Sequence, residues 1–232
     1  MDFTRIRAFI FDMDGLMLDT ERIALAAWTQ AVEEVGVDLP EGFFVQLIGK
    51  RTSDSQQLIR DQLGETAPVD ALWASWGRHF EAHVEGEPIP TKPGLHGLLD
   101  FLERRRFPKI VATSTGGPRA RRHLSDVGLL ERFEDVVSGR DVALGKPAPD
   151  IFLRAAQVLA IEPAHCLVLE DSGPGIEGAH AAGMLPVLIP DLHAPSPEQR
   201  SLAAFEFPWL GAFQAAFASA LDDQEAGAAD DL

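Results

Sequence analysis

Short apolar runs recur along the chain, and each is separated from the next by a helical pattern or a turn. The runs cover residues 6–12, 109–113, 134–137, 166–170 and 185–189. Runs of this length that end at turn signals predict buried strands. Because strands that alternate with helices form parallel sheets, the sequence predicts an α/β fold built on a doubly wound parallel sheet.

The stretch between the first two predicted strands breaks this rhythm. It predicts four helices and no strand, at about 20–35, 41–48, 53–63 and 68–85. We therefore expect a helical domain, residues 17–88, inserted into a core made of residues 1–16 and 89–232. The insert's aromatic residues have the spacing of a small bundle core; they are Trp28, Phe43, Phe44, Trp73, Trp76 and Phe80. From about residue 222 the sequence predicts a frayed acidic tail.

Charge and composition limit the partners of this chain. Its 232 residues carry a net charge of −16, which argues against nucleic acid because phosphate neutralisation needs clustered Lys and Arg. Arg119, Arg121 and Arg122 fall on one predicted helix, where we expect them to face solvent. No stretch predicts a signal peptide or a membrane span, and the single cysteine, Cys166, cannot form an internal disulfide. We expect a cytoplasmic protein without membrane partners, and nothing requires more than a monomer, with a weak dimer as the alternative.

Chemically active side chains gather at the ends of the predicted strands, where ligands bind in open parallel sheets. In chain order they are Asp12, Asp14, Thr113, Ser114, Lys146, Glu170 and Asp171. Carboxylates at one edge repel one another unless a cation lies among them, and this donor set suits Mg²⁺. The lysine, the hydroxyls and the backbone N–H groups of the turn at 114–117 suit the oxygens of a phosphoryl group. The edge therefore predicts a Mg²⁺ site beside a phosphoryl site.

The spacing of Asp12 and Asp14 has its own meaning. At the end of a strand, positions i and i+2 start on the same face, so both carboxylates can face one site. One carboxylate can attack phosphorus, while the other protonates the leaving oxygen and later activates water.

These motifs, in this order, resemble those of the haloacid dehalogenase (HAD) superfamily of phosphohydrolases, from about residue 8 to residue 190. Residues 11–21 (FDMDG, then DTE) resemble the first motif, which implies Asp12 as nucleophile and Asp14 as general acid/base. Residues 113–114 resemble the second motif, which implies Thr113 as a phosphate-binding hydroxyl beside Ser114. Residues 145–152 resemble the third, which implies Lys146 as the phosphate clamp.

The fourth motif resembles residues 168–172, which implies Glu170 and Asp171 as metal ligands with Asp12 and the backbone carbonyl of Asp14. The resemblance also implies a Rossmann-like core with a C1-type cap. The implied reaction is Mg²⁺-dependent hydrolysis of a small phosphomonoester, a sugar phosphate or similar metabolite, through an aspartyl-phosphate.

The segment 49–54 resembles the substrate-recognition loop of capped relatives. Lys50 and Arg51 are therefore candidates to meet a distal anionic group of the substrate. A solvated helix start is the equally open alternative.

Two positions depart from the relatives. The EDS motif is shared with β-phosphoglucomutase-like proteins, which place a histidine ten residues after the acid/base aspartate, where this chain has Ala24. Hydrolysis is therefore favoured, and a phosphosugar mutase is the alternative. Many members carry a second acidic residue where this chain has Gly175, which leaves Glu170 as the substitute metal ligand.

One motif points to different chemistry. Residues 173–178 match GxGxxG after a predicted strand, and Asp191 follows 18 residues after Gly173, as in a dinucleotide-binding turn. Glu170 and Asp171 would repel a pyrophosphate there, so a nicotinamide- or flavin-dependent oxidoreductase is the distant alternative. A non-catalytic binding protein is disfavoured because none of the motif residues is missing.

Overall fold

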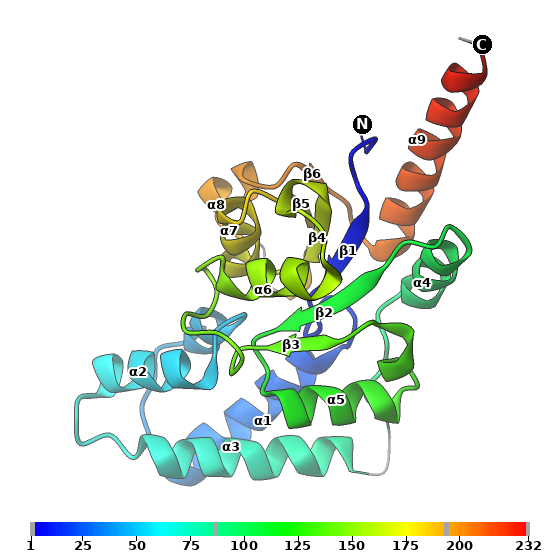
Figure 1. Ribbon diagram of the computed structural model, residues 1–232. Coiled ribbons are helices and arrows are strands. Elements are labelled where there is room, and N and C mark those ends of the chain that lie inside the picture. The colour runs from blue at the N-terminus through cyan, green and yellow to red at the C-terminus, as the bar shows by residue number, and fades with distance from the viewer. Residues whose placement is uncertain (1–2, 86–87, 193–194, 231–232) are drawn as a thin grey trace.

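The computed structural model describes residues 3–85, 88–192 and 195–230, without side chains beyond residue 223, and shows one six-stranded parallel sheet (Figure 1). Its strands are β1 (Ala8–Phe11), β2 (Lys109–Thr113), β3 (Val136–Ser138), β4 (Cys166–Glu170), β5 (Leu185–Leu188) and β6 (Phe205–Glu206). Their order is β3-β2-β1-β4-β5-β6, with every neighbouring pair parallel. The chain thus winds outward from β1 in both directions, which confirms the Rossmann-like α/β fold.

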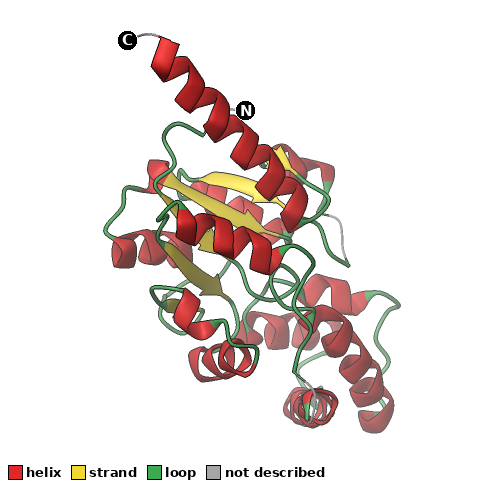
Figure 2. Ribbon diagram, turned by 90° about the vertical axis from the view of Figure 1, so that its right-hand side faces the viewer, coloured by secondary structure: helices red, strands yellow, loops and turns green. Residues whose placement is uncertain are grey.

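Helices cover both faces of this sheet (Figure 2). Successive strand residues point to opposite faces, so Phe9 and Phe11 pack on one side and Ala8 and Ile10 on the other. The first side is covered by α4 (Leu95–Arg104), α5 (Gly117–Asp126) and α9 (Leu210–Asp230), and the second by α6 (Asp150–Leu159) and α7 (Gly173–Ala181). Three short elements complete this part: η2 (Leu130–Arg132), η3 (Pro163–His165) and α8 (Pro197–Ser201).

A separate helical layer lies beyond one end of the sheet (Figure 1). It consists of α1 (Thr20–Val35), the 3-10 helix η1 (Phe43–Leu47), α2 (Thr52–Leu63) and α3 (Val69–Val84). Its own apolar core includes Trp28, Phe43 and Leu72. The helix predicted at 41–48 is only a short 3-10 turn, because residues with positive φ, Gly42 and Gly49, bound the segment on both sides.

The two connections between the helical layer and the sheet run side by side. Leu18 and Thr91 form an antiparallel bridge, and the backbone N–H groups of Asp19 and Lys92 donate to the carbonyls of Pro90 and Met17. The layer is therefore attached through one paired strip of backbone, next to the end of β1.

Most predicted elements are confirmed, and the differences have local causes. The third strand begins at Val136, two residues later than expected, because Glu134 and Asp135 precede the apolar pair. The two-residue strand β6 was not predicted, since two residues carry no periodicity. The acidic end is not a frayed tail: α9 continues to Asp230, as its alanine-rich sequence favours. No helix in the described ranges is long and apolar enough to cross a membrane.

Helix α9 is attached to the sheet by aromatic side chains. The ring of Phe217 lies 5.0 Å from that of Phe3 and 5.2 Å from that of Phe9, both in edge-on geometry. It also contacts the rings of Phe101 and Phe107, 6.0 and 5.7 Å away. Phe217 is fully buried, so this ring is the centre of the contact between α9 and the sheet.

We expect Phe217→Ala to lower the free energy of unfolding by about 3–5 kcal/mol, because a buried ring is replaced by a cavity. Chemical denaturation measures this change. Leu153→Ala is the control, since Leu153 is 42% exposed and its loss should change stability by about 0.5 kcal/mol or less. Equal effects of the two substitutions would contradict this account of how α9 is held.

Candidate active site

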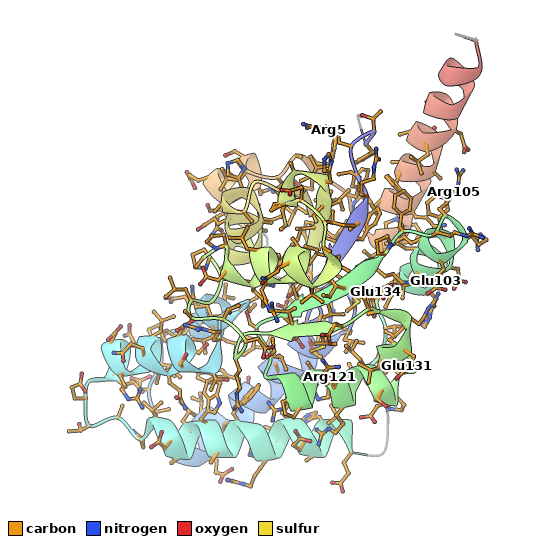
Figure 3. All side chains as sticks on the ribbon, viewed as in Figure 1. Arg5, Glu103, Arg105, Arg121, Glu131 and Glu134 are labelled. Carbon is orange, nitrogen blue, oxygen red and sulfur yellow. The ribbon has the colours of Figure 1, made fainter. Side chains whose placement is uncertain are left out.

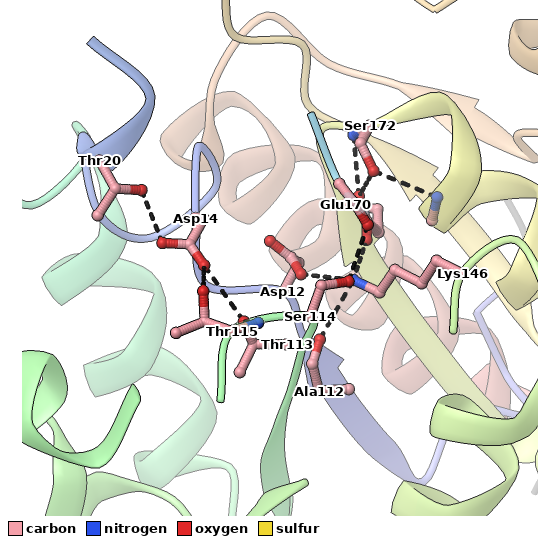
Figure 4. Close-up of polar contacts among 12 residues, drawn as sticks. Asp12, Asp14, Thr20, Ala112, Thr113, Ser114, Thr115, Lys146, Glu170 and Ser172 are labelled. Carbon is pink, nitrogen blue, oxygen red and sulfur yellow. Dashed lines mark hydrogen bonds and ion pairs between the residues drawn. The ribbon is translucent and has the colours of Figure 1, made fainter. Parts of the chain in front are cut away.

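The parallel register brings the ends of β1, β2 and β4 together at one edge of the sheet. Phe11 lies beside Val111 of β2 and Leu169 of β4. Asp12 therefore follows β1 at the level where β4 ends in Glu170. Figure 4 shows the side chains from these ends, with Lys146 beside them, meeting in one cluster. The structure thus assembles residues that are up to 158 positions apart, from Asp12 to Glu170.

Lys146 is the centre of this cluster. Its Nζ lies 2.5 Å from Oδ1 of Asp12 and 2.5 Å from Oε1 of Glu170, and it also donates to the carbonyl of Ala112 at 3.3 Å. The side chain is buried, and its Nζ lies 5.2 Å from the centre of the Phe152 ring. Although burial favours the neutral amine, the charges of Asp12 and Glu170 raise the pKa of Lys146. The ammonium therefore stays charged.

Three buried carboxylates form a potential metal site. Each of Asp12, Glu170 and Asp171 offers an oxygen, and these oxygens lie within 4.8 Å of one another. Burial raises the pKa of Asp12 to about 8, against the opposing charge of Lys146. Burial and the charge of Glu170 raise the pKa of Asp171 well above its usual value. One ammonium does not balance three carboxylates, so this all-oxygen donor set fits a hard divalent cation such as Mg²⁺.

Two glycines leave room for the carboxylates because they have no side chain. At Gly15, with φ of +83°, an added Cβ would lie 2.3 Å from Oδ2 of Asp171. At Gly175 it would lie 1.8 Å from Oε1 of Glu170. Any side chain at this position, an acidic one included, would therefore collide with Glu170. At Gly173 it would meet the side chain of Gln199, at 2.1 Å, so two glycines of the GxGxxG match serve side-chain packing.

Asp14 faces a set of threonines. Its Oδ1 accepts a hydrogen bond from Thr20 at 2.8 Å, and its Oδ2 accepts from Thr115 at 2.8 Å and from Thr113 at 3.2 Å. Figure 4 shows this carboxyl pointing toward the threonines and away from Lys146. Thr113 also accepts from the backbone N–H of Thr115. The two aspartates of the first motif therefore occupy distinct surroundings.

The remaining predicted binding residues are placed differently. Ser114 donates to the carbonyl of Gly49 at 2.8 Å and so joins the core to the helical layer. Lys50 lines the cavity described next. Arg51 does not line it, since its guanidinium pairs with Asp54 and donates to the carbonyl of Ala143. The structure thus brings only Lys50 of that pair to the cavity.

A cavity of about 520 Å³ opens above this edge, between the core and the helical layer. Asp12, Asp14 and Asp171 lie at its polar end. The helical layer contributes apolar side chains to its wall, among them Phe44, Trp73, Trp76 and Phe80, which the sequence predicted only as bundle core. Ala24 also lies in the wall and offers a methyl group where mutases have an imidazole.

Sequence reasoning missed several residues of the cavity: Thr20, Glu21, Thr115, Arg119, His123 and Ser172. Thr20, Glu21 and Ser172 lie within the quoted motifs and Thr115 lies in the turn at 114–117, so their position was a usable signal. Burial and the charge of nearby Asp191 together raise the pKa of Glu21 to about 8. Arg119 was expected to face solvent but lies over the rings of Trp76 and Phe80. Nothing in the sequence distinguished His123.

Comparisons with known proteins agree with this geometry. A family model described as haloacid dehalogenase-like hydrolase matches residues 6–183. The chain is 32% identical to fructose-1-phosphate phosphatase YqaB of Escherichia coli, over 78% of this chain and 95% of that one. It is 30% identical to a phosphorylated carbohydrates phosphatase of Thermotoga maritima, over 77% and 82%.

A solved structure, CbbY from Rhodobacter sphaeroides in complex with xylulose-(1,5)bisphosphate, matches with a TM-score of 0.75 at 25% identity. The match covers 89% of this chain and 95% of that chain.

We expect Mg²⁺ to stabilise the folded protein, because the acidic cluster exists only in the folded chain. At a hundred times its Kd the ion should raise the free energy of unfolding by about 2.7 kcal/mol. In Asp171→Asn, which removes one of the three carboxylates, most of this gain should disappear. Thermal unfolding with Mg²⁺ and with EDTA, at constant ionic strength, measures both.

The control variant is Glu131→Gln, which changes an exposed carboxylate at the periphery of the core (Figure 3). It should keep the full Mg²⁺-dependent shift. If Asp171→Asn kept the same shift as this control, the ion would bind elsewhere.

Proposed function

The chain belongs to the haloacid dehalogenase-like hydrolase family, and we propose that it hydrolyses a small phosphomonoester with Mg²⁺ through an aspartyl-phosphate on Asp12. The observation that carries the proposal is the contact of Asp12 with Lys146, 2.5 Å apart, beside the acidic cluster at the polar end of the cavity. Two relatives of at least 30% identity are phosphatases by name, one for fructose 1-phosphate and one for phosphorylated carbohydrates. The chain is accordingly a phosphoric monoester hydrolase that acts on small phosphorylated metabolites.

In the first half of the proposed reaction, an oxygen of Asp12 forms a bond to phosphorus while the bond from phosphorus to the alcohol oxygen breaks. Asp14 donates its proton to that oxygen. Lys146 holds Asp12 in place and supplies positive charge next to the transferring group. In the second half, Asp14 takes a proton from water as the water oxygen attacks phosphorus, which releases phosphate and restores Asp12.

The metal would be held by Asp12, Asp171 and Glu170, with the backbone carbonyl of Asp14. When bound, Mg²⁺ supplies positive charge that offsets the negative charge of the phosphoryl oxygens. We assign phosphate binding to Thr113 and Ser114 together with Lys146, and contact with the rest of the substrate to Lys50.

We further propose that residues 17–88 act as a cap over a core made of residues 1–16 and 89–232. Residues of both parts line the cavity, and several side-chain hydrogen bonds join them, among them those from Ser114 to Gly49, from Arg51 to Ala143 and from Arg119 to Glu81. The paired backbone strip at Leu18 and Thr91 is the natural hinge. A closed cap would exclude bulk water during phosphoryl transfer.

Ala24 favours hydrolysis over a mutase reaction. Its side chain has no polar atom to compete with water, and its carbonyl accepts a hydrogen bond from Nε1 of Trp76 at 3.1 Å. The aspartyl-phosphate is therefore left open to attack by water.

The test is phosphate release from p-nitrophenyl phosphate, glucose 1-phosphate and glucose 6-phosphate, with Mg²⁺ and with EDTA. We expect Mg²⁺-dependent release, its loss in Asp12→Asn, and a decrease in kcat of about 10²–10⁴-fold in Asp14→Asn. Circular dichroism should show that Asp12→Asn stays folded, because Lys146 keeps its pair with Glu170.

Asp126→Asn, at an exposed carboxylate of α5, is the control and should retain activity. Near-normal turnover by Asp12→Asn would falsify the mechanism. Interconversion of the two glucose phosphates without phosphate release would instead establish a mutase.

A further inference from the structure

The cavity is chemically divided along its length. The sheet edge supplies carboxylates and hydroxyls, whereas α3 supplies Trp73, Trp76 and Phe80, which we call the ring wall. The ring centres of Trp73 and Trp76 lie 5.1 Å apart and those of Trp76 and Phe80 lie 5.4 Å apart. These residues follow one another at positions i, i+3 and i+7, so they form one continuous stripe of the helix.

Other residues of the protein do not fully cover the ring wall. Trp73 and Trp76 remain half-buried while they line the cavity. The faces of these rings offer no hydrogen bonds to the hydroxyls of a sugar. A planar unsaturated ring, by contrast, gains stacking energy on such a surface.

His123 adds a polar group beside the ring wall. It lies on α5, is 3% exposed, and its ring stacks on Phe80 at 5.8 Å with an interplanar angle of 27°. Neither ring nitrogen has a hydrogen-bond partner among the residues that the structure describes. Because an unsatisfied buried polar atom is costly, a group that enters the cavity is the natural partner.

The charge state of His123 suits a neutral partner. Burial lowers its pKa below the usual value, so the ring is neutral and offers one donor and one acceptor. The nearby cation Arg119 is already engaged, since it pairs with Glu81 at 3.1 Å and lies 5.6 Å from the ring centre of Trp76. This end of the cavity therefore matches a planar, neutral, hydrogen-bonding group better than a second anion.

We propose that the leaving group of the substrate carries a planar heteroaromatic ring, which stacks on the ring wall and forms a hydrogen bond with His123. This inference rests on the proposed phosphatase function and specifies the substrate class of the same site. The phosphoryl group then lies at the Asp12 end, and the ring lies between the helical layer and α5.

A matched pair of esters tests the inference. Uridine 5′-monophosphate and ribose 5-phosphate share the phosphorylated ribose and differ in the base. We expect kcat/KM for the uridine ester to exceed that for the ribose ester by about tenfold or more, the effect of one base–aromatic stack. Equal values, or a preference for ribose 5-phosphate, would overturn the inference and leave the phosphatase proposal intact.

Substitutions then identify the residues that cause the preference for the uridine ester. Trp76→Leu should reduce the ratio of the two kcat/KM values by about tenfold, and His123→Phe, which keeps a ring against Phe80, by about three- to tenfold. Trp209→Leu is the control, because Trp209 is 47% exposed and does not line the cavity. A ratio that neither Trp76→Leu nor His123→Phe changes would contradict the assignment.

Binding provides a readout without turnover. Uridine 5′-monophosphate should quench the tryptophan fluorescence of Asp12→Asn at lower concentration than ribose 5-phosphate quenches it, and adding Trp76→Leu should abolish the difference. If no ester in either panel released phosphate, the proposed function would fail, and this titration would still decide the inference. Equal or weaker binding of the uridine ester would refute it.

Discussion

The ion pairs of Lys146 with Asp12 and Glu170 hold the functional edge of this protein together. A buried ammonium requires opposite charges, and these two come from β1 and β4, while the lysine follows β3. The arrangement can form only when the sheet order places those strand ends side by side. One ammonium also leaves excess negative charge among three carboxylates, and this excess suits the cluster to a cation.

The core and the helical layer contribute different kinds of side chain to the rest of the site. The core provides the polar end of the cavity, where strand ends fix the carboxylates, and the helical layer provides its apolar wall. The two parts meet through several side-chain hydrogen bonds and one paired backbone strip. Substitutions in the ring wall should leave the buried ion pairs intact, since those pairs involve only Lys146, Asp12 and Glu170.

Much of this could be predicted because the motifs are tied to strand ends. The apolar runs before Asp12 and before Glu170 are short and bounded by turn residues, so the strands and their ends could be located. Parallel strands present their carboxyl ends at one edge, which placed the motif residues together. Binding residues away from the strand ends were harder to predict. Arg51 was predicted to contact the substrate and does not line the cavity, whereas Arg119 was predicted to face solvent and does line it.

The sequence by itself determined the α/β fold, the helical insert and the residues of the acidic edge, because these depend on hydrophobic period and on local turns. Only the tertiary structure decided that Gly175 leaves room for Glu170, that three threonines face Asp14 and that α3 turns its rings toward α5. Helix periodicity shows which residues share a face, but not whether that face meets a core or a cavity. His123 is the clearest case, since its role follows from its neighbours alone.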